Sequence, residues 1–388
     1  MILYDAGVTV NYQDYGIMLP IAPDRGKHVL EFLNAKSEND ACGNSNEEHC
    51  VFSALDFFAA QAFLGLNIDD CLLTRKDLER VHNRKYIDEL YGKGLEAALL
   101  KTFELIDADG NPCRYEPDSA VKPLSDLFNT LIKQAGGTYL ACLLALETSR
   151  RKTLADTDGF CYYLGGGMHH ARYDCGSGFC LINDVTAAAF KLSAAEKARL
   201  IWIIDTDAHK GDGTAELVQF ARNRGELLLP GGTCSQLKTD DCKRGIFTLS
   251  INMARGWPLD KDSLASAEEG RAPLIPSDVD IGIESGGEAE YTALLAEGIK
   301  KLESLSGGLR PDFAIVVDGA DPYEYDGLDS SGLLRLTLEQ CIKRDTFVYN
   351  YLKENKIPSA WIQAGGYGER AWEPSAHFLQ NVFKTHNS

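Results

Sequence analysis

Four short apolar runs recur along the second half of this 388-residue chain, and segments with the apolar spacing of amphipathic helices separate them. The runs are Leu200–Ile204, Phe247–Ile251, Phe313–Val317 and Ser359–Ile362. Each is four or five residues long and rich in Ile, Val, Trp or Phe, which is typical of a strand buried on both faces. Strands that alternate with helices predict an α/β protein with a mainly parallel sheet.

The expected helices follow the same alternation. Tyr291–Leu305 and Leu338–Lys353 have helical period, and Gly136-Gly137 precedes an apolar helix-like segment, Thr138–Glu147. The chain contains no repeat and no linker rich in Pro, Gly and Ser, so we expect a single domain over residues 1–388. Two polar segments, 35–50 and 222–245, are expected to be surface insertions.

Polar side chains follow these apolar runs, where a parallel sheet presents its ligand-binding loops. Such residues are Asp205, Asp207 and His209 after the first run, Asp321 after the third, Tyr367 after the fourth, and His169 and His170 after a further stretch, Phe160–Leu164. The carboxyl ends of parallel strands lie at one edge of the sheet, so the sequence predicts one site that collects them.

The segment Asp205-Thr-Asp207-Ala-His209 offers a carboxylate and an imidazole two residues apart, which project to one side of an extended strand end. They are two of the ligands that a catalytic zinc ion needs, and Asp321 in Gly319-Ala-Asp321-Pro322 offers a third. Three protein ligands leave one position open, as a hydrolytic site requires. The alternative is a helix cap followed by a surface histidine.

The adjacent histidines in Gly165-Gly-Gly-Met-His169-His170 suit a proton acceptor and a proton donor, because imidazole titrates near neutral pH. Asp205 and Asp212 flank the metal motif and are available to orient them. The alternative is a pair of histidines that serve only to structure a loop. Tyr367, between the glycines of Gly365-Gly366-Tyr367-Gly368, could donate a hydrogen bond to a substrate carbonyl. Phe179 in Gly178-Phe179-Cys180 could form the wall of a tunnel or pack in the core.

Charge and cysteine content narrow the class of protein. The net charge of −18 argues against direct binding to a nucleic acid and suits a cationic ligand such as a lysine-rich tail or a polyamine, although an acidic surface also serves solubility alone. We expect no secretory signal and no membrane span. The 11 cysteines have no framework spacing, which favours reduced thiols and a cytoplasmic protein.

The order and wording of five motifs resemble those of the histone-deacetylase and acetylpolyamine-amidohydrolase family, whose fold is that of arginase. The motifs are GGGMHHA, GFCLIND, DTDAHKGDGT, DGADP and GGYG, and the resemblance runs from about residue 136 to residue 372. Val81–Tyr86 matches more loosely, and Ile342–Asp345 leans towards the class IV branch. The resemblance implies a central, mainly parallel, eight-stranded sheet flanked by helices.

The resemblance also implies roles. Zinc ligands fall at Asp207, His209 and Asp321, and the pairs are His169 with Asp205 and His170 with Asp212. In the family pattern His170 is the better candidate for the general base, His169 supports the transition state electrostatically, and Tyr367 donates to the carbonyl oxygen. A substrate tunnel would be lined by Gly178, Phe179, Trp257 and Gly366. A structural K⁺ would be held by Asp205, Asp207, His209, Ser250 and Ile251.

The predicted function is therefore zinc-dependent hydrolysis of acetyl or longer acyl groups from lysine side chains of proteins or peptides, by metal-activated water. The alternative within the family is an acetylpolyamine amidohydrolase. An arginase-like ureohydrolase and a scaffold without activity are disfavoured by the histidine pair and the complete set of motifs. The sequence leaves the oligomeric state open. It also leaves three candidates for an aspartate at the tunnel rim, Asp107, Asp109 and Asp118, and for the Cys42, His49 and Cys50 loop either a second metal site or free thiols.

Overall fold

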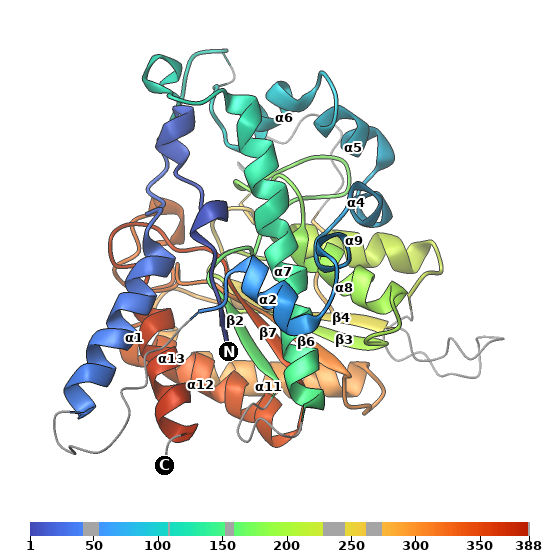
Figure 1. The fold of residues 1–388 in the computed structure, drawn as a ribbon, viewed down its shortest axis with the longest axis vertical. Coiled ribbons are helices and arrows are strands. Elements are labelled where there is room, and N and C mark those ends of the chain that lie inside the picture. Colours follow the sequence, from blue (N-terminus) through green and yellow to red (C-terminus); the bar gives the residue numbers. More distant parts are fainter. Residues whose placement is uncertain (42–53, 108, 152–158, 228–244, 261–273, 387–388) are drawn as a thin grey trace.

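A computed structural model describes residues 1–41, 54–107, 109–151, 159–227, 245–260 and 274–386 (Figure 1). Within these residues the chain forms one seven-stranded sheet in the order β1-β2-β7-β6-β3-β4-β5, and every neighbouring pair is parallel. The strands are β1 (Ile2–Leu3), β2 (Phe160–Tyr163), β3 (Leu200–Asp205), β4 (Gly245–Met253), β5 (Val279–Ile283), β6 (Phe313–Asp318) and β7 (Ser359–Gln363).

The predicted α/β class and the parallel sheet are confirmed, whereas the sheet of the described residues has seven strands instead of the eight expected. All four apolar runs form strands, and so does the stretch before the histidine pair. The pattern did not predict β1 and β5. β1 is only two residues long, and β5 is an edge strand in which only Val279 and Ile283 are buried, so neither carries a continuous apolar run.

Helices cover both faces of the sheet (Figure 1). They are α1 (Arg25–Ala41), α2 (Phe57–Leu64), α3 (Ile68–Cys71), α4 (Arg75–Val81), α5 (Arg84–Leu90), α6 (Leu95–Thr102), α7 (Leu127–Arg150), α8 (Asp184–Ala194), α9 (Asp212–Asn223), α11 (Tyr291–Leu305), α12 (Leu338–Glu354) and α13 (Glu373–His386). Among these residues, no helix combines the length and the apolar character that crossing a membrane would need.

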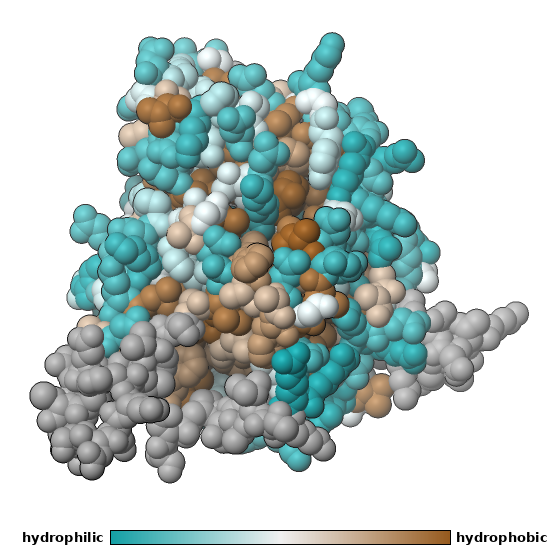
Figure 2. Space-filling model, in the orientation of Figure 1, coloured by the Kyte–Doolittle hydropathy of each residue, from teal (hydrophilic) through white to brown (hydrophobic). Residues whose placement is uncertain are grey.

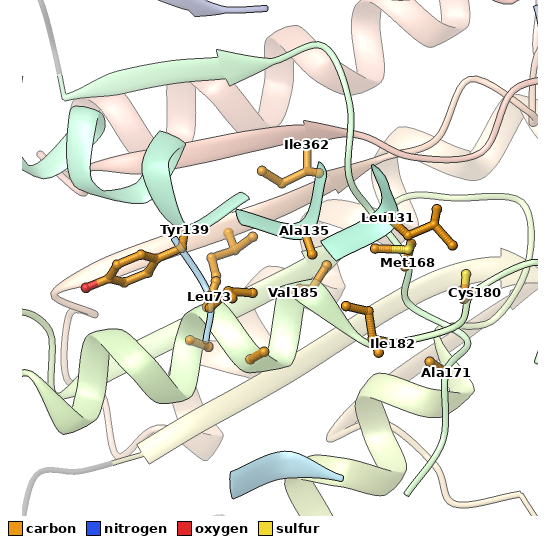
Figure 3. Packing of buried hydrophobic residues seen from close by; sticks show 14 of the residues in the cluster. Leu73, Leu131, Ala135, Tyr139, Met168, Ala171, Cys180, Ile182, Val185 and Ile362 are labelled. Atoms are coloured by element: carbon orange, nitrogen blue, oxygen red, sulfur yellow. The ribbon is translucent and has the colours of Figure 1, made fainter. Parts of the chain in front are cut away.

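Two apolar clusters hold the layers together, and the alternation of side chains along each strand feeds both. Ile201 and Ile203 of β3 pack with α7 and α8, while Trp202 and Ile204 pack with α11 and α12 on the other face. Figure 3 shows the first cluster, in which Ala135 of α7 faces Val185 of α8. Burial on both faces explains why these strands have continuous apolar sequences.

Two helices begin at residues whose side chains accept hydrogen bonds from backbone N–H groups of the first turn. Thr337 and Gln340 form a reciprocal capping box at the start of α12, and Asn183 accepts the Thr186 N–H at the start of α8. α7 is longer than the predicted Thr138–Glu147, because Gly136 and Gly137 lie inside the helix. In the orientation of Figure 1, hydrophilic side chains cover most of the surface, and apolar ones gather across its middle (Figure 2).

The two predicted insertions fall largely outside the described residues. Residues 35–41 form the end of α1, and 42–50, with Cys42, His49 and Cys50, lie outside. Residues 222–227 include the end of α9, and 228–244 lie outside.

Candidate functional site

The carboxyl ends of β2, β7, β6 and β3 lie side by side in the sheet, and the loops that follow them carry the predicted site residues. β3 ends at Asp205, β6 at Asp318 and β7 at Gln363. The His169-His170 loop follows β2. Because all four strands are parallel, the tertiary structure collects these side chains at one edge, as predicted.

Asp207, His209 and Asp321 form a compact cluster in which one potential ligand atom from each lies within 4.8 Å of the others. His209 Nδ1 is 2.8 Å from Asp321 Oδ2 and 3.3 Å from Asp207 Oδ1. The other ring nitrogen, Nε2, lies 3.2 Å from the Ser330 hydroxyl, a partner that the sequence did not suggest. Two carboxylates and one imidazole are a donor set that suits zinc.

Glycines allow the backbone to approach this cluster. A side chain at Gly365 would lie 2.7 Å from Asp321 Oδ2 and would overlap Asp207, and one at Gly319 would also overlap Asp207. The Gly365 N–H donates to Asp207 Oδ2 at 3.0 Å, and the Ala208 N–H donates to Asp321 Oδ1 at 2.9 Å. Backbone N–H groups therefore hold both carboxylates, and one oxygen of each, Asp207 Oδ1 and Asp321 Oδ2, is directed at His209.

The electrostatics of the cluster favour a cation. Burial lowers the pKa of His209, but its hydrogen bonds with Asp207 and Asp321 raise the pKa overall to about 10. Burial and the charge of Asp207 raise the pKa of Asp321 to about 7. Burial alone would raise the pKa of Asp207, but the charge of His169 and the hydrogen bond with His209 lower it well below its usual value, so Asp207 stays ionised while Asp321 and His209 hold protons tightly. A metal cation would neutralise the same buried negative charge. The residues fit a divalent metal ion.

The two histidines beside the cluster form separate hydrogen-bonded pairs. His169 Nδ1 donates to Asp205 Oδ2 at 2.7 Å, and His170 Nδ1 donates to Asp212 Oδ1 at 2.8 Å. All four side chains are buried, and the ring centroids of the histidines are 3.9 Å apart. Each carboxylate holds the Nδ1 of its imidazole, so both rings can present Nε2 to the site, where His169 Nε2 lies 3.8 Å from Asp207 Oδ1.

The two histidines differ in charge. Burial lowers the pKa of His169, yet the carboxylates of Asp205 and Asp207 raise it overall to about 9. For His170, burial and the neighbouring His169 charge lower the pKa to about 4, in spite of Asp212. These shifts favour a neutral His170 and a protonated His169 at neutral pH.

Hydrogen bonds of Asn183 hold the loop that carries His169 and His170. Its side-chain amide donates to His169 O at 3.1 Å and to Thr214 Oγ1 at 3.1 Å. Its own N–H donates to His82 Nε2 at 2.9 Å, and His82 Nδ1 lies 2.8 Å from Arg172 O. In the sequence, Asn183 and His82 are only parts of longer motifs, and their contacts could not be predicted from it.

Tyr367 lies in the loop after β7, and its backbone is bound on both sides by the loop after β6. The Tyr367 N–H donates to Asp326 Oδ2 at 2.7 Å, and the Gly327 N–H donates to Tyr367 O at 3.0 Å. Burial raises the pKa of Tyr367 well above its usual value, so the hydroxyl stays protonated and can donate. Asp326 was not predicted as a site residue.

The predicted tunnel residues lie around these groups. Phe179 packs edge-on to Tyr367 with ring centroids 6.4 Å apart, and it stacks on Phe103. Trp257 lies 4.5 Å from the His170 ring, and a side chain at Gly178 would overlap it. Gly366 faces Arg25, since an added side chain would meet that guanidinium at 2.8 Å.

A pocket of about 120 Å³ lies beside these residues. Gly178, Phe179, Gly366 and Tyr367 line it, together with residues that the sequence did not predict, among them Tyr12, Arg25, Met168 and Cys180. Arg25 donates to Gly366 O at 3.1 Å and to Gln363 O at 3.2 Å. No local signal could have assigned Arg25, because its partners lie more than 300 residues away.

Two further predictions concern the surroundings of the site. The register of the sheet pairs Asp205, at the end of β3, with Ser250 inside β4, which brings two of the residues named for a monovalent cation side by side. Of the three candidate rim aspartates, Asp107 accepts the N–H groups of Asp109 and Asn111 in its own turn, and Asp118 lies in a short 3₁₀ helix. Both assignments stay predictions.

Comparison with known proteins places this geometry in context. Residues 20–383 match the model of the histone deacetylase domain. An uncharacterized protein of Picosynechococcus is 29% identical over 235 residues, which are 60% of this chain and 61% of that protein. Histone deacetylase 2 of Arabidopsis thaliana is 23% identical over 333 residues, 86% of this chain and 70% of the relative.

The acetoin utilization protein AcuC of Staphylococcus aureus is 29% identical over 230 residues, 57% of this chain and 49% of the relative. The chain thus spans between about half and about two thirds of the length of these relatives. Among solved structures, the HD domain of HDA15 superposes with a TM-score of 0.56 at 19% identity, covering 98% of this chain and 90% of that one. This likeness shows the fold.

Proposed function

Because the chain belongs to the histone deacetylase family, we propose that it is a zinc-dependent amidohydrolase that removes acetyl or longer acyl groups from lysine side chains of proteins or peptides. Membership of the family implies a hydrolase that acts on acetyl amides. The substrate and the metal are our proposal.

One observation carries the proposal. A buried three-ligand cluster, two histidine–aspartate pairs and a protonated tyrosine converge at a single edge of the sheet. The arrangement supplies a metal site, a base, a cationic group and a hydroxyl donor, which together are the requirements for metal-assisted amide hydrolysis.

Asp207, His209 and Asp321 would hold the zinc ion, which supplies a Lewis acid for the amide carbonyl and promotes ionisation of a water molecule. We propose K⁺ for a site behind the zinc site, held by Asp205, Asp207, His209, Ser250 and Ile251.

The chain's own residues would divide the proton transfers. His170 is neutral, and Asp212 occupies its Nδ1, so Nε2 is the atom that accepts the proton of the attacking water. His169 is held as a cation by Asp205, so it stabilises the negative charge that develops on the substrate. The Tyr367 hydroxyl donates to the carbonyl oxygen, and a histidine delivers the proton to the departing amine.

The pocket of about 120 Å³ beside Phe179 and Tyr367 supports the proposal of acyl groups longer than acetyl, and Met168, Cys180 and Tyr12 also line it. Each further methylene group that becomes buried contributes about 0.8 kcal/mol to substrate binding. The number of methylene groups that the pocket accommodates would therefore decide the preferred acyl-chain length.

The test is turnover of zinc-loaded protein on a panel of acetyl-, octanoyl- and myristoyl-lysine peptides beside N-acetylputrescine and N-acetylspermidine. We expect release from the peptides that chelation abolishes. Preference for the free polyamines would instead identify an acetylpolyamine amidohydrolase, and no turnover of any compound by zinc-loaded protein would overturn the proposal.

The ligand assignment has its own test. Asp321→Ala removes a ligand instead of a proton carrier, so it should abolish both zinc retention and activity. Metal analysis of the purified variant checks this, with Asp69→Ala, at an exposed position in α3, as the control. Full zinc content in Asp321→Ala would show that the ligand assignment is wrong.

A further inference from the structure

Arg344 is a fully buried arginine in α12, within the Ile342–Asp345 segment whose function the site leaves unexplained. Its relative exposure is 0%. A guanidinium is retained in a protein interior only where its N–H groups all meet acceptors in fixed directions. Its partners therefore indicate what Arg344 does.

Two of those partners are carboxylates and two are main-chain carbonyls. Arg344 Nε donates to Asp345 Oδ1 at 2.6 Å, and Nη2 donates to Asp318 Oδ1 at 2.7 Å. Nη1 donates to Thr206 O and to Gly319 O, each at 3.0 Å. The carboxylates aim the guanidinium, and a single nitrogen bridges two backbone segments.

The two bridged segments are those that carry the candidate metal ligands. Thr206 immediately precedes Asp207, and Gly319 lies two residues before Asp321. Both carbonyls follow the last residues of their strands, since β3 ends at Asp205 and β6 ends at Asp318. Arg344 thus connects the two strand ends where the regular ladder between β3 and β6 has stopped.

A buried polar network extends the same support. Asp318 Oδ2 accepts the Tyr162 hydroxyl at 2.6 Å, and that hydroxyl also lies 2.8 Å from Ser375 Oγ. Asp318 is thereby held from β2 and α13 as well as by Arg344. The carboxylate that directs the guanidinium is itself fixed on both oxygens.

We infer that Arg344 is a positioning residue that sets the spacing between the Asp207–His209 loop and Asp321, and thereby the affinity of the site for zinc. This inference rests on the proposed function, because it takes those three residues as the ligands. The planar guanidinium can bond two carbonyls and a carboxylate at once, whereas a lysine ammonium cannot reproduce that geometry.

Arg222 provides a matched control. It is 6% exposed, forms a two-point ion pair with Asp278, and donates to the main-chain Ile246 O at 2.7 Å. Ile246 is the second residue of β4, at the end of the sheet opposite the site. Arg222→Lys and Arg344→Lys therefore remove the same kind of buried contact, but only the latter lies at the ligand-bearing strand ends.

The experiment is a competitive chelator titration of full-length wild type, Arg344→Lys and Arg222→Lys, with thermal midpoints measured in parallel. We expect both variants to melt earlier, zinc affinity to fall by about 10- to 100-fold in Arg344→Lys, and zinc affinity to stay within about twofold of wild type in Arg222→Lys. Equal zinc affinity in the two variants would overturn the inference, because a general loss of stability affects both.

Should Arg344→Lys not fold, Asp318→Asn and Asp278→Asn decide the question in the same assay. Each removes the charge that orients one of the two arginines, and only Asp318→Asn should weaken zinc binding. Unchanged affinity in Asp318→Asn would contradict the inference. A wild-type protein that retains no zinc would overturn the proposed function, which is a different result from equal affinities among variants of a zinc-binding wild type.

Discussion

At the scale of single residues, the site depends on side chains that touch no substrate. Asp326 is one of them: its Oδ2 accepts the Tyr367 N–H, while Oδ1 accepts the Leu328 N–H at 2.9 Å and the Ser331 hydroxyl at 2.7 Å. Both oxygens are acceptors only. An asparagine would turn an N–H₂ group towards one of these donors, so Tyr367 or its supporting loop would shift.

We therefore expect Asp326→Asn to lower kcat by about 10-fold with little change in KM, because even a small displacement of a catalytic group slows the reaction.

Tyr367→Phe should retain zinc and lose about 10²- to 10³-fold in kcat, the usual scale for one oxyanion donor. Steady-state kinetics on an acyl-lysine peptide measures both.

The double variant tests the connection between them. If Asp326 acts through the Tyr367 hydroxyl, Asp326→Asn should have no further effect in the Tyr367→Phe background. Independent, multiplicative losses would show that Asp326 acts elsewhere.

His82 makes the stability of the protein depend on pH. Burial lowers its pKa to about 4, against an ordinary 6.5 in the unfolded chain. Its Nε2 accepts the Asn183 N–H, so the folded protein requires the neutral ring. Between those two pKa values the unfolded chain binds the extra proton, so stability falls as the pH decreases from 6.5 towards 4, and His82 has no such effect above 6.5.

Denaturant unfolding at pH 7.5 and pH 5 checks this for wild type and His82→Gln. The wild type should lose about 2 kcal/mol more than the variant between the two pH values, from the linkage of that pKa difference. Equal losses would mean that His82 is not the group that titrates.

At the scale of elements, the close approach of α7 to β2 keeps the site's supporting layer in place. A β-carbon on Gly137 would overlap Tyr163 and lie 2.6 Å from Phe57 Cζ. Tyr163 is buried in β2, and its hydroxyl donates to Gln134 O at 3.0 Å, so the ring cannot move aside. A β-carbon on the neighbouring Gly136 would meet chiefly the mobile end of Leu72.

Gly137→Ala should therefore destabilise the protein by about 1–3 kcal/mol through overpacking, despite the better helix propensity of alanine. Gly136→Ala should lie within about 1 kcal/mol of wild type, since its neighbour can rotate away and the propensity gain remains. Chemical denaturation of the two variants measures the difference. Similar stabilities would contradict the close packing of α7 on β2.

At the scale of the whole molecule, the net charge of −18 should increase the rate at which the protein associates with a cationic substrate. Charges on the surface attract a cationic peptide over about a Debye length, which is roughly 10 Å at 0.1 M salt. We expect kcat/KM for a lysine-rich acyl-lysine peptide to fall on the order of 10-fold between low and high salt.

A peptide of equal length with glutamates beside the acyl-lysine is the control, and its kcat/KM should rise or stay constant with salt. A parallel decline for both peptides would indicate a general salt effect on the enzyme instead of steering.

Much of the site was predictable because its signals are local. A strand buried on both faces must be a continuous apolar run, and the polar residues that follow a parallel strand lie at its carboxyl end. These two rules predicted five strands, the α/β class and the loops of Asp207, His169 and Tyr367. The helix Tyr291–Leu305 agreed with its apolar period to the residue. The edge strand β5 was not predicted, because only its end residues are buried and it has no continuous apolar run.

What the sequence by itself determined is therefore which segments become strands and helices and which side chains lie at strand ends, because backbone geometry and burial periodicity act within a few residues. Only the tertiary structure decided the strand order, the contact of Arg25 with the Tyr367 loop, the hydrogen bond of Asp326 with Tyr367 and the bridge of Arg344 between the loops that follow β3 and β6. These contacts join residues that are tens to hundreds of positions apart, and they form only when the layers pack, so no local pattern encodes them.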